Sequence, residues 1–293
     1  MAKIIITDPV AKDAVEKLRA LGHEVDVNTE HPKDKLDEII APYEVHVIRS
    51  ATKVREPLID KMENMKMIIR GGVGIDNIDH QYAESKGIAV RNTPTASSDS
   101  VAELALAHMF AIYRFIPPAN ITMRNGEWNK KKYKGREVSG KVLGIVGIGR
   151  IGQSLAKKAI ALGMTVLAHD PFVDSCGLET VSMNCLDTIL KESDIISLHV
   201  PAGEKPLIGA EEIAKMKDGA VVINCARGGV VDEDALCDAL DAGKLSGAGV
   251  DVFVQEPTKN ERLVNHPLVS VTPHIGASTT EAQARVGDEI VKI

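Results

Sequence analysis

Short runs of apolar residues recur along the whole chain and alternate with segments whose apolar residues follow helical spacing. The runs are apolar almost throughout, which is typical of strands covered on both faces in a parallel sheet. A first series of strands is predicted at residues 3–7, 24–27, 45–49, 66–70 and 88–90. A second series is predicted at residues 142–147, 165–169, 194–198, 220–224, 248–250 and 268–271. This alternation predicts an α/β fold with parallel sheets.

The two series share a repeated local pattern. Residues 3–6 lead through a predicted helix at 11–21 to a glycine and a second strand, and residues 141–145 lead on in the same order. Each repeat reads as a β-α-β unit, so we expect two doubly wound domains. Between the series, residues 101–112 predict one long helix, whereas the polar and basic residues 120–140 predict a loop. Any two α/β domains can share such a repeat, so it indicates no function.

Composition narrows the class of protein. The 293 residues suffice for two domains of roughly 150 residues each. A hydrophobic fraction of 44% and a charged fraction of 26% argue against disorder. The net charge of −6 and the aromatic fraction of 3% leave neither a basic patch nor stacking platforms for nucleic acid. We therefore expect no nucleic-acid partner.

Targeting, membrane and metal signals are weak. Met1-Ala2-Lys3 leads into only three isoleucines, far short of a secretory signal, and no segment reaches the run of about 18 apolar residues that a membrane span needs. The four cysteines show no CxxC spacing and predict neither a zinc site nor a disulfide framework. The expectation is a cytoplasmic protein with no metal and no membrane partner.

The strongest local motif is the glycine-rich sequence Gly147-Ile-Gly149-Arg150-Ile151-Gly152. An apolar strand precedes it and an amphipathic helix pattern follows, which is the context in which this spacing indicates dinucleotide binding. The first glycine allows a tight turn, the second lets the backbone approach a pyrophosphate, and the third packs the helix against the strand. The free N–H groups at the start of that helix favour the phosphate charge.

A carboxylate follows at the spacing that such a site requires. Asp170 ends the next predicted strand, where its oxygens can accept hydrogen bonds from an adenosine ribose. The same charge repels a 2′-phosphate, and Pro171-Phe172 brings no arginine to offset it. NAD is therefore expected rather than NADP. The alternative, in which Asp170 only forms a turn before Pro171, leaves the spacing unexplained.

Polar side chains follow three later strands, at the carboxyl ends where ligands bind in open α/β sheets. Arg227 follows residues 220–224, Glu256 comes shortly after residues 248–250, and His274 follows residues 268–271. Arg227 can hold a substrate carboxylate through two parallel hydrogen bonds. His274 is the candidate general acid/base, with Glu256 to orient it. From the residues alone, a structural ion pair of Arg227 and Glu256 is an equally good interpretation.

One further histidine follows a predicted strand. His199 comes directly after residues 194–198, and Val200-Pro201 stand beside it. These apolar neighbours indicate an edge of the cofactor site rather than a catalytic role.

Three segments resemble the signatures of the D-isomer specific 2-hydroxyacid dehydrogenase family: Asn224-Cys-Ala-Arg-Gly-Gly-Val-Val-Asp-Glu, Asp251-Val-Phe-Val-Gln-Glu-Pro and Thr272-Pro-His-Ile-Gly-Ala-Ser-Thr. The resemblance covers nearly the whole chain. Segments that begin at Arg70, Ser100 and Gly126 are most similar to the D-3-phosphoglycerate dehydrogenase branch: Arg-Gly-Gly-Val-Gly-Ile-Asp-Asn-Ile-Asp, Ser-Val-Ala-Glu-Leu and Gly-Glu-Trp-Asn-Lys-Lys-Lys-Tyr-Lys-Gly. This resemblance implies NAD-dependent oxidation of 3-phospho-D-glycerate to 3-phosphohydroxypyruvate, the entry step to serine synthesis.

The resemblance also implies an architecture. Residues 1–92 and 277–293 are expected to form a discontinuous, flavodoxin-like substrate-binding domain, and residues 93–276 an inserted Rossmann domain that binds NAD. A homodimer built around the nucleotide-binding domains is expected. Larger members of the family carry a C-terminal regulatory domain, and no segment of this sequence is expected to form one.

The resemblance assigns further residues to ligands. Arg227, Glu256 and His274 take the roles described above. Besides the glycine motif, Asp170 and His199-Val200-Pro201, cofactor contacts are implied for Val73, Cys225, Ala226, Asp251 (on the nicotinamide amide), Gly276 and Ala277. Substrate contacts are implied for Arg49, Ser50, Gly72, Val73, Asn92, Arg227 and His274. Arg49, Ser50 and Thr52 are candidates for the substrate phosphate, and Lys130 for a cation supplied by the partner subunit. A solvated lysine run at residues 130–132 is an equally good interpretation.

Departures from the family pattern leave alternatives open. Ser97 stands where the family usually has asparagine, and the short segment at residues 200–208 has Pro206 where glycine is common. A glyoxylate or hydroxypyruvate reductase of the same fold is the nearest alternative enzyme. An NAD-sensing protein that resembles the transcriptional corepressors of this family is the alternative of another class, because those relatives keep the Arg, Glu and His residues.

Overall fold

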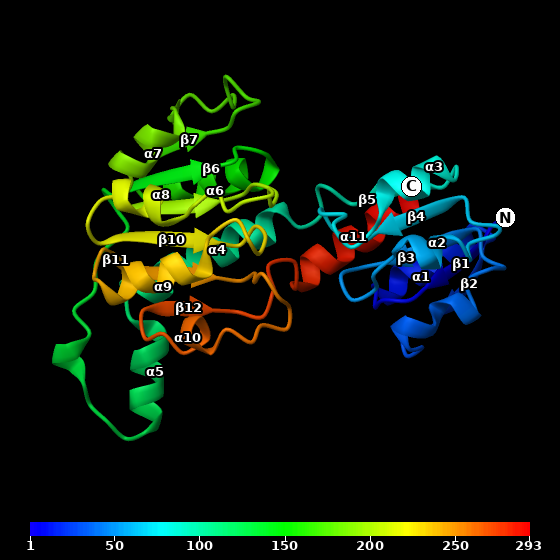
Figure 1. The fold of residues 1–293 in the computed structure, drawn as a ribbon, viewed down its shortest axis with the longest axis horizontal. Helices are drawn as coiled ribbons and strands as arrows, with labels where there is room; N and C mark the ends of the chain where they lie inside the picture. The colour runs from blue at the N-terminus through cyan, green and yellow to red at the C-terminus, as the bar shows by residue number, and fades with distance from the viewer. The chain divides into compact units, whose positions relative to one another are not determined.

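The computed structural model describes residues 1–293, and these divide into two compact units (Figure 1). The first unit contains residues 1–98 and 277–293, and the second contains residues 99–276. Each unit has one parallel sheet, so the predicted α/β class with two parallel-sheet domains is confirmed. The predicted boundary after residue 92 lies inside the first unit, which continues to Ser98.

The first unit has five parallel strands in the order β2-β1-β3-β4-β5. Its elements are β1 (Lys3–Ile6), α1 (Lys12–Ala20), β2 (Glu24–Val27), the 3₁₀ helix η1 (Lys33–Glu38), β3 (Val45–Ile48), α2 (Glu56–Ile59), β4 (Met67–Arg70), α3 (His80–Ser85), β5 (Ala89–Asn92) and α11 (Thr280–Lys292).

Helices cover both faces of this sheet, which explains why its strands are apolar throughout. Ile4 and Ile6 of β1 pack with side chains of α1 and α11, whereas Ile5 between them packs on the other face with Ile59 of α2. All three isoleucines are buried. Burial on both faces is the arrangement that a parallel sheet requires.

The second unit has seven parallel strands in the order β12-β11-β10-β9-β6-β7-β8. Its elements are α4 (Ser98–Tyr113), α5 (Ile116–Arg124), the 3₁₀ helix η2 (Lys130–Lys132), β6 (Val142–Val146), α6 (Arg150–Ala161), β7 (Thr165–His169), β8 (Val181–Met183), α7 (Leu186–Glu192), β9 (Ile195–Leu198), α8 (Ala210–Lys215), β10 (Ala220–Asn224), α9 (Glu233–Asp241), β11 (Leu245–Val250), α10 (Glu261–Val264) and β12 (Val269–Val271).

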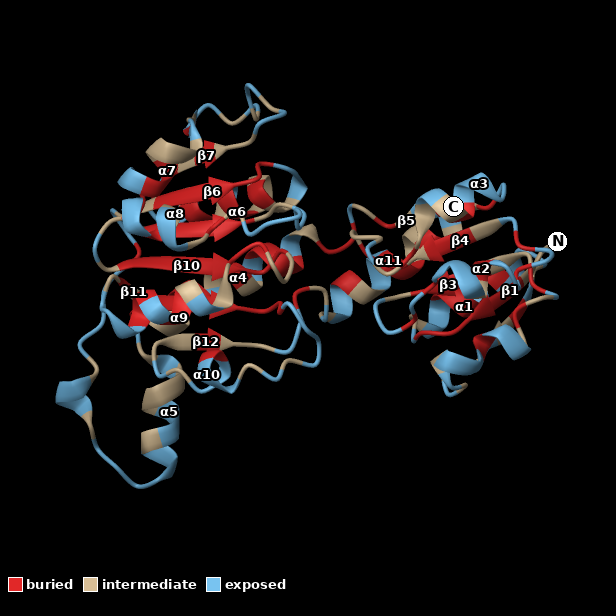
Figure 2. Cartoon of the chain, viewed as in Figure 1, coloured by how far each residue is buried: buried red, intermediate tan, exposed pale blue.

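The strand order of the second unit reverses between β6 and β9, which lie side by side although β7 and β8 come between them in sequence. This is the doubly wound arrangement of dinucleotide-binding sheets, with the reversal as the topological switch point. Two apolar cores cover the sheet, one with α4 and α6 and the other with α7, α8, α9 and α10. The strands are buried while the outer helix faces are exposed (Figure 2).

The segment predicted as a loop at residues 120–140 is in part helical. Helix α5 begins at Ile116 and runs to Arg124, with Pro117 and Pro118 in its first turn. The first four N–H groups of a helix have no partner within the helix, so prolines cost little there. The prediction of a loop from residue 120 was therefore wrong for residues 120–124, which belong to α5.

No helix of the chain is long and apolar enough to cross a membrane. The longest, α4, has 16 residues.

Candidate functional site

The glycine-rich loop lies at the switch point of the second unit. Gly147 follows β6 with φ of +92°, a left-handed conformation that glycine adopts without strain. Its N–H donates to the carbonyl of His169 at 2.8 Å. A Cβ at Gly147 would lie 2.4 Å from the carbonyl oxygen of His199, which follows the neighbouring strand β9. The turn therefore needs glycine for its conformation and for the close approach of β9.

The start of α6 has the shape that a pyrophosphate group requires. A Cβ at Gly152 would lie 2.2 Å from the carbonyl oxygen of Gly147, so this glycine lets the helix pack against the loop. Gly149 caps the helix, and a Cβ there would meet open space. Arg150 and Ile151 form the first turn of the helix, whose unpaired N–H groups attract negative charge. These residues fit a dinucleotide cofactor.

Asp170 has two backbone partners. Its Oδ2 accepts a hydrogen bond from the N–H of Ile148 at 3.0 Å, and its Oδ1 accepts one from the N–H of Phe172 at 3.0 Å. The carboxylate thus ties the glycine-rich loop to β7 and also forms the turn that was the alternative interpretation. Each oxygen has a second lone pair, so these bonds leave room for ribose hydroxyls. The Phe172 side chain is 93% exposed.

We expect the double substitution Asp170→Ala with Phe172→Arg to lower the preference for NAD over NADP by roughly 10- to 150-fold, because it removes a charged acceptor and adds a cation. The measurement is the ratio of kcat/KM for the two cofactors. Phe172→Arg alone is the matched control, since it keeps both hydrogen bonds of Asp170. Full retention of the preference in the double variant would contradict the assignment of Asp170 to the ribose.

His274 and Glu256 form the pair that the sequence predicted. Nδ1 of His274 lies 2.8 Å from Oε2 of Glu256, and Oε1 of Glu256 accepts a hydrogen bond from the N–H of Phe253 at 3.1 Å. The two side chains are 37% and 38% exposed, so the pair faces solvent rather than the core. Because a carboxylate only accepts hydrogen bonds, Nδ1 carries the proton and Nε2 is the nitrogen left for a ligand.

The backbone of His274 is held in an unusual conformation, with φ of +53°. The buried carboxylate of Asp251 fixes the loop around it, since it accepts hydrogen bonds from Thr272 Oγ1 at 2.6 Å, Ile275 N at 2.8 Å and Gly276 N at 2.9 Å. Surroundings of this kind are needed to maintain a left-handed non-glycine residue. Contact of Asp251 with the nicotinamide amide stays a prediction; its hydrogen bonds in the structure go to the loop.

A buried histidine that the sequence did not predict as part of the site lies behind this loop. His108 of α4 lies with Nε2 3.1 Å from Thr272 Oγ1 and Nδ1 2.9 Å from Ser270 Oγ. Thr272 donates its hydroxyl proton to Asp251, so it accepts from Nε2–H of His108. Burial lowers the pKa of His108, with a smaller opposing effect from the charge of Asp251. The available signal was an ionisable residue on the apolar face of the predicted long helix.

Arg227 lies on a loop that packs against the loop of Glu256. Its Nη1 donates to the carbonyl of Ala226 at 2.7 Å. The Asn224 side chain fixes the turn, because it donates to the carbonyl of Arg227 at 2.9 Å and accepts from Ala226 N at 3.1 Å. A Cβ at Gly228 would lie 1.9 Å from the carbonyl oxygen of Phe253, so only glycine permits this packing. The loops after β10 and β11 therefore pack in close backbone contact.

The other predicted cofactor residues of this unit lie at the same strand ends. Cys225 and Ala226 are buried, and burial raises the pKa of the Cys225 thiol, which makes it inert as a nucleophile. Nε2 of His199 lies 3.0 Å from Ser197 Oγ, and burial lowers the pKa of His199 to about 4. His199 is therefore neutral near pH 7. The cofactor contacts of Cys225, Ala226, His199, Val200, Pro201 and Gly276 stay predictions.

The substrate candidates of the first unit lie at the ends of its own strands. Asn92 at the end of β5 donates to the carbonyl of Val73 at 2.5 Å, and the N–H of Thr93 donates to the carbonyl of Gly72 at 3.1 Å. Arg49, which follows β3, donates through Nη1 to Oε1 of Gln283 in α11. These bonds give the loop after β4 and the Arg49 side chain defined positions.

Other candidates of this group differ in exposure. Ser50 is exposed, whereas Thr52 is fully buried and donates its hydroxyl to Asp8 Oδ1 at 2.8 Å. Thr52 therefore stabilises the turn, and its contact with a substrate phosphate stays a prediction. Lys130 is exposed in η2. Ala277 is the first residue of the C-terminal part of the first unit. Their contacts with ligands stay predictions.

The second unit thus combines a doubly wound parallel sheet, a glycine-rich turn at its switch point and the hydrogen-bonded side chains of His274 and Glu256. Residues 106–276 match the family model described as D-isomer specific 2-hydroxyacid dehydrogenase, NAD binding domain. The chain belongs to the D-isomer specific 2-hydroxyacid dehydrogenase family, and its cofactor is NAD.

Individual relatives differ in their names and lengths. The chain is 48% identical over 296 aligned residues to a hydroxypyruvate reductase of Thermotoga maritima, covering 99% of this chain and 96% of that protein. It is 47% identical to a D-3-phosphoglycerate dehydrogenase of Methanocaldococcus jannaschii, covering 98% of this chain but only 56% of that protein. The chain therefore spans about half the length of that relative.

A solved structure supports the fold and the cofactor. The D-lactate dehydrogenase of Aquifex aeolicus, complexed with NAD and lactic acid, superposes with a TM-score of 0.86 at 32% sequence identity. The superposition covers 99% of this chain and 93% of that protein.

Proposed function

We propose that this enzyme interconverts 3-phospho-D-glycerate and 3-phosphohydroxypyruvate with NAD as hydride carrier. The observation that carries the proposal of a 2-hydroxy acid substrate is the contact of His274 with Glu256 at 2.8 Å. The loop of Glu256 also packs closely against the loop of Arg227. A general base, an orienting carboxylate and a guanidinium for a carboxylate are what oxidation of a 2-hydroxy acid requires.

The proposed mechanism gives each side chain one task. Arg227 binds the substrate carboxylate with its guanidinium fork. Nε2 of His274 takes the proton of the C2 hydroxyl, while Nδ1–H donates to Glu256 and keeps the ring in place. The glycine-rich loop and the start of α6 would hold NAD, which would supply the acceptor for the hydride of C2, so that the hydroxy acid would lose two electrons and become a keto acid. In the reverse direction the protonated His274 returns the proton to the keto oxygen.

A phosphorylated substrate is supported by the similarity to D-3-phosphoglycerate dehydrogenases and by arginines in the first unit. Arg49 follows β3, and Arg70 ends the neighbouring strand β4, where it pairs with Ile48. The parallel register places both residues at one edge of the sheet. A phosphate carries close to two negative charges at neutral pH, so cations at that edge favour it. We propose Arg49 as the phosphate-binding residue.

Hydroxypyruvate reduction is the second candidate function. The Thermotoga maritima relative of that name matches this chain over nearly the full length of both proteins. Arg49 donates a hydrogen bond to Gln283, so it has a protein partner without any phosphate. Its presence is therefore also compatible with an unphosphorylated substrate.

Turnover distinguishes an enzyme from a dinucleotide sensor. With NADH and a 2-keto acid, the proposed function predicts continuous loss of the NADH absorbance at 340 nm, with the D-hydroxy acid as product. Binding of NADH without turnover of any of 3-phosphohydroxypyruvate, hydroxypyruvate, glyoxylate and pyruvate would favour the sensor.

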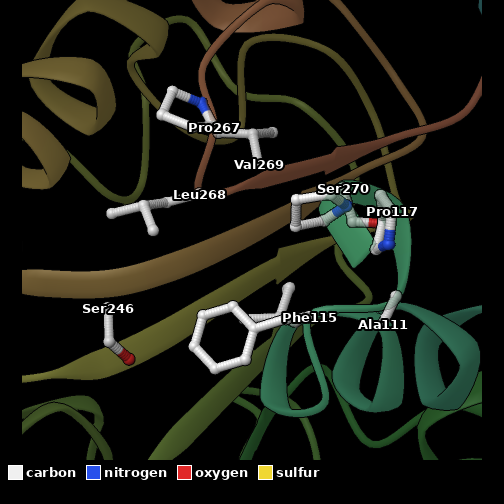
Figure 3. Close-up of a pocket in the computed structure, with 10 residues that line it drawn as sticks. Ala111, Phe115, Pro117, Ser246, Pro267, Leu268, Val269 and Ser270 are labelled. Carbon is white, nitrogen blue, oxygen red and sulfur yellow. The ribbon is translucent and has the colours of Figure 1, made fainter. Parts of the chain in front are cut away.

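A homodimer is also proposed, from the exposed segment that contains α5 and η2. No side chain of α5 is buried, and Ile121, Met123 and Trp128 are 59%, 53% and 78% exposed. The segment extends away from the sheet of its unit (Figure 1). Beside its start, Phe115, Pro117 and Leu268 line an apolar groove between α4, α5 and β12 (Figure 3). Apolar surface of this kind is typical of an interface between subunits.

Sedimentation measures the oligomeric state of the chain directly. The chain is expected to sediment as a dimer at micromolar concentration, and Ile121→Asp is expected to shift it toward the monomer, because it places a charge in the apolar interface. A monomeric wild-type chain would contradict the proposal.

A further inference from the structure

A carboxylate outside the proposed catalytic set holds the loop that contains Glu256. Glu233 is the first residue of α9. Its Oε1 accepts a hydrogen bond from the N–H of Val254 at 2.9 Å, and its Oε2 accepts one from Nδ2 of Asn260 at 2.8 Å. Val254 and Asn260 flank Glu256 in the sequence, so the two oxygens of one side chain fasten both ends of the loop at residues 254–260.

The side chain of Asn260, at the C-terminal end of loop 254–260, cannot reorient freely. Oδ1 of Asn260 accepts a hydrogen bond from the N–H of Leu263 at 3.1 Å and so caps α10. An amide flip would turn Nδ2 toward this N–H and leave the helix uncapped. Asn260 therefore presents a donor to Glu233, and Val254 presents a second donor. Only a side chain with two acceptor oxygens satisfies both.

The near end of the loop continues directly into the acid/base pair. The N–H of Phe253, next to Val254, donates to Oε1 of Glu256 at 3.1 Å, and Oε2 of Glu256 lies 2.8 Å from Nδ1 of His274. The carbonyl of Phe253 lies against Gly228, which limits movement on its other side. A shift at Val254 therefore moves the backbone donor that orients the Glu256 carboxylate.

We propose that Glu233 is a positioning residue for Glu256, an inference that rests on the acid/base roles proposed above. Glu233 acts through loop 254–260 and sets the orientation of Glu256 toward His274. The contacts of its carboxylate are with Val254 and Asn260, so we assign it no contact with substrate or cofactor. Its loss changes the chemical step and leaves cofactor binding intact, because the glycine-rich loop and α6 lie on other strand ends of the unit.

The experiment exchanges the carboxylate of Glu233 and the amide of Asn260 between the two positions. Glu233→Gln replaces one acceptor oxygen by an amide donor that faces Nδ2 of Asn260. It is expected to lower kcat by roughly 5- to 50-fold, with the NADH dissociation constant unchanged within about 2-fold. Asn260→Asp alone places two carboxylates together and is expected to lower kcat as well. The combination restores one donor and one acceptor, while Oδ1 of the aspartate still caps α10, so kcat is expected to recover to within about 3-fold of wild type.

Two further variants make the outcome decisive. Asp232→Ala removes a carboxylate next to Glu233 that accepts hydrogen bonds only from Asp234 N and Ala235 N within α9, so it lowers stability without releasing the loop. If it lowers kcat as much as Glu233→Gln at matched melting temperature, the effect is one of stability and the proposal fails. If the double exchange does not recover kcat, the proposal fails as well.

Glu256→Gln separates this inference from the proposed function. If Glu256→Gln itself leaves kcat unchanged, the acid/base assignment fails, whatever Glu233 does. If Glu256→Gln lowers kcat and Glu233→Gln does not, the assignment stands and the positioning role is wrong. When both lower kcat, combining them is expected to cause no greater loss than Glu256→Gln alone, because Glu233 acts only through Glu256. Additive losses would contradict that route.

Discussion

Alanine at position 274 is expected to lower kcat by roughly 10²- to 10⁴-fold, the usual contribution of a positioned acid/base group. Nδ1 of His274 is occupied by Glu256 at 2.8 Å, so Nε2 is the nitrogen that exchanges a proton with the substrate. No other histidine lies on the loops after β10, β11 and β12. Steady-state kinetics with NADH and a 2-keto acid measure the loss.

The control for this variant addresses the backbone. His274 has φ of +53°, a conformation that alanine adopts poorly and asparagine adopts more readily. His274→Asn should therefore retain the loop and lose the same activity, and both variants should bind NADH with wild-type affinity by fluorescence titration. A variant with near-normal turnover would move the proton-transfer role to another group.

Removal of the Arg49 guanidinium is expected to discriminate between substrates. Arg49→Ala should lower kcat/KM for 3-phosphohydroxypyruvate by roughly 10- to 150-fold, because a charge-assisted contact of about 1.5–3 kcal/mol is lost. Hydroxypyruvate should be nearly unaffected, since it has no phosphate. The comparison of kcat/KM on the two substrates checks this.

The structural contact of Arg49 supplies the matched control. Gln283→Leu removes the protein partner of the guanidinium and keeps the charge. It should change activity on both substrates little. If Arg49→Ala and Gln283→Leu instead cause equal losses on both substrates, Arg49 holds α11 rather than a phosphate.

The sequence predicted most strands because their apolar runs reflect burial on both faces. Strands β2, β7 and β10 have the predicted bounds. Strand β11 begins at Leu245, three residues before the predicted start. The prediction missed these residues because Ser246 and Gly247 interrupt the apolar run. A Cβ at Gly247 would lie 2.3 Å from the Ile112 side chain, so glycine is needed there for α4 to pack. Strand β8, with Ser182 between two apolar residues at the sheet edge, was missed.

The candidate site was predictable where residues directly follow strands. His274 and Glu256 were placed together because parallel strands β11 and β12 end at one edge, and the structure joins them. The contacts that hold these loops were not predictable, because they depend on which loop meets which. The bonds of Asp251 to residues 272–276, and of His108 to Thr272, join segments far apart in the sequence.

The most direct test of the central claim is kcat/KM for NADH-dependent reduction of 3-phosphohydroxypyruvate and of hydroxypyruvate, measured on the same wild-type preparation. The substrates differ only in the phosphate. A phosphate-binding guanidinium predicts a ratio of at least roughly 10 in favour of 3-phosphohydroxypyruvate. Equal values, or a preference for hydroxypyruvate, would contradict the phosphoglycerate assignment and leave a hydroxypyruvate reductase.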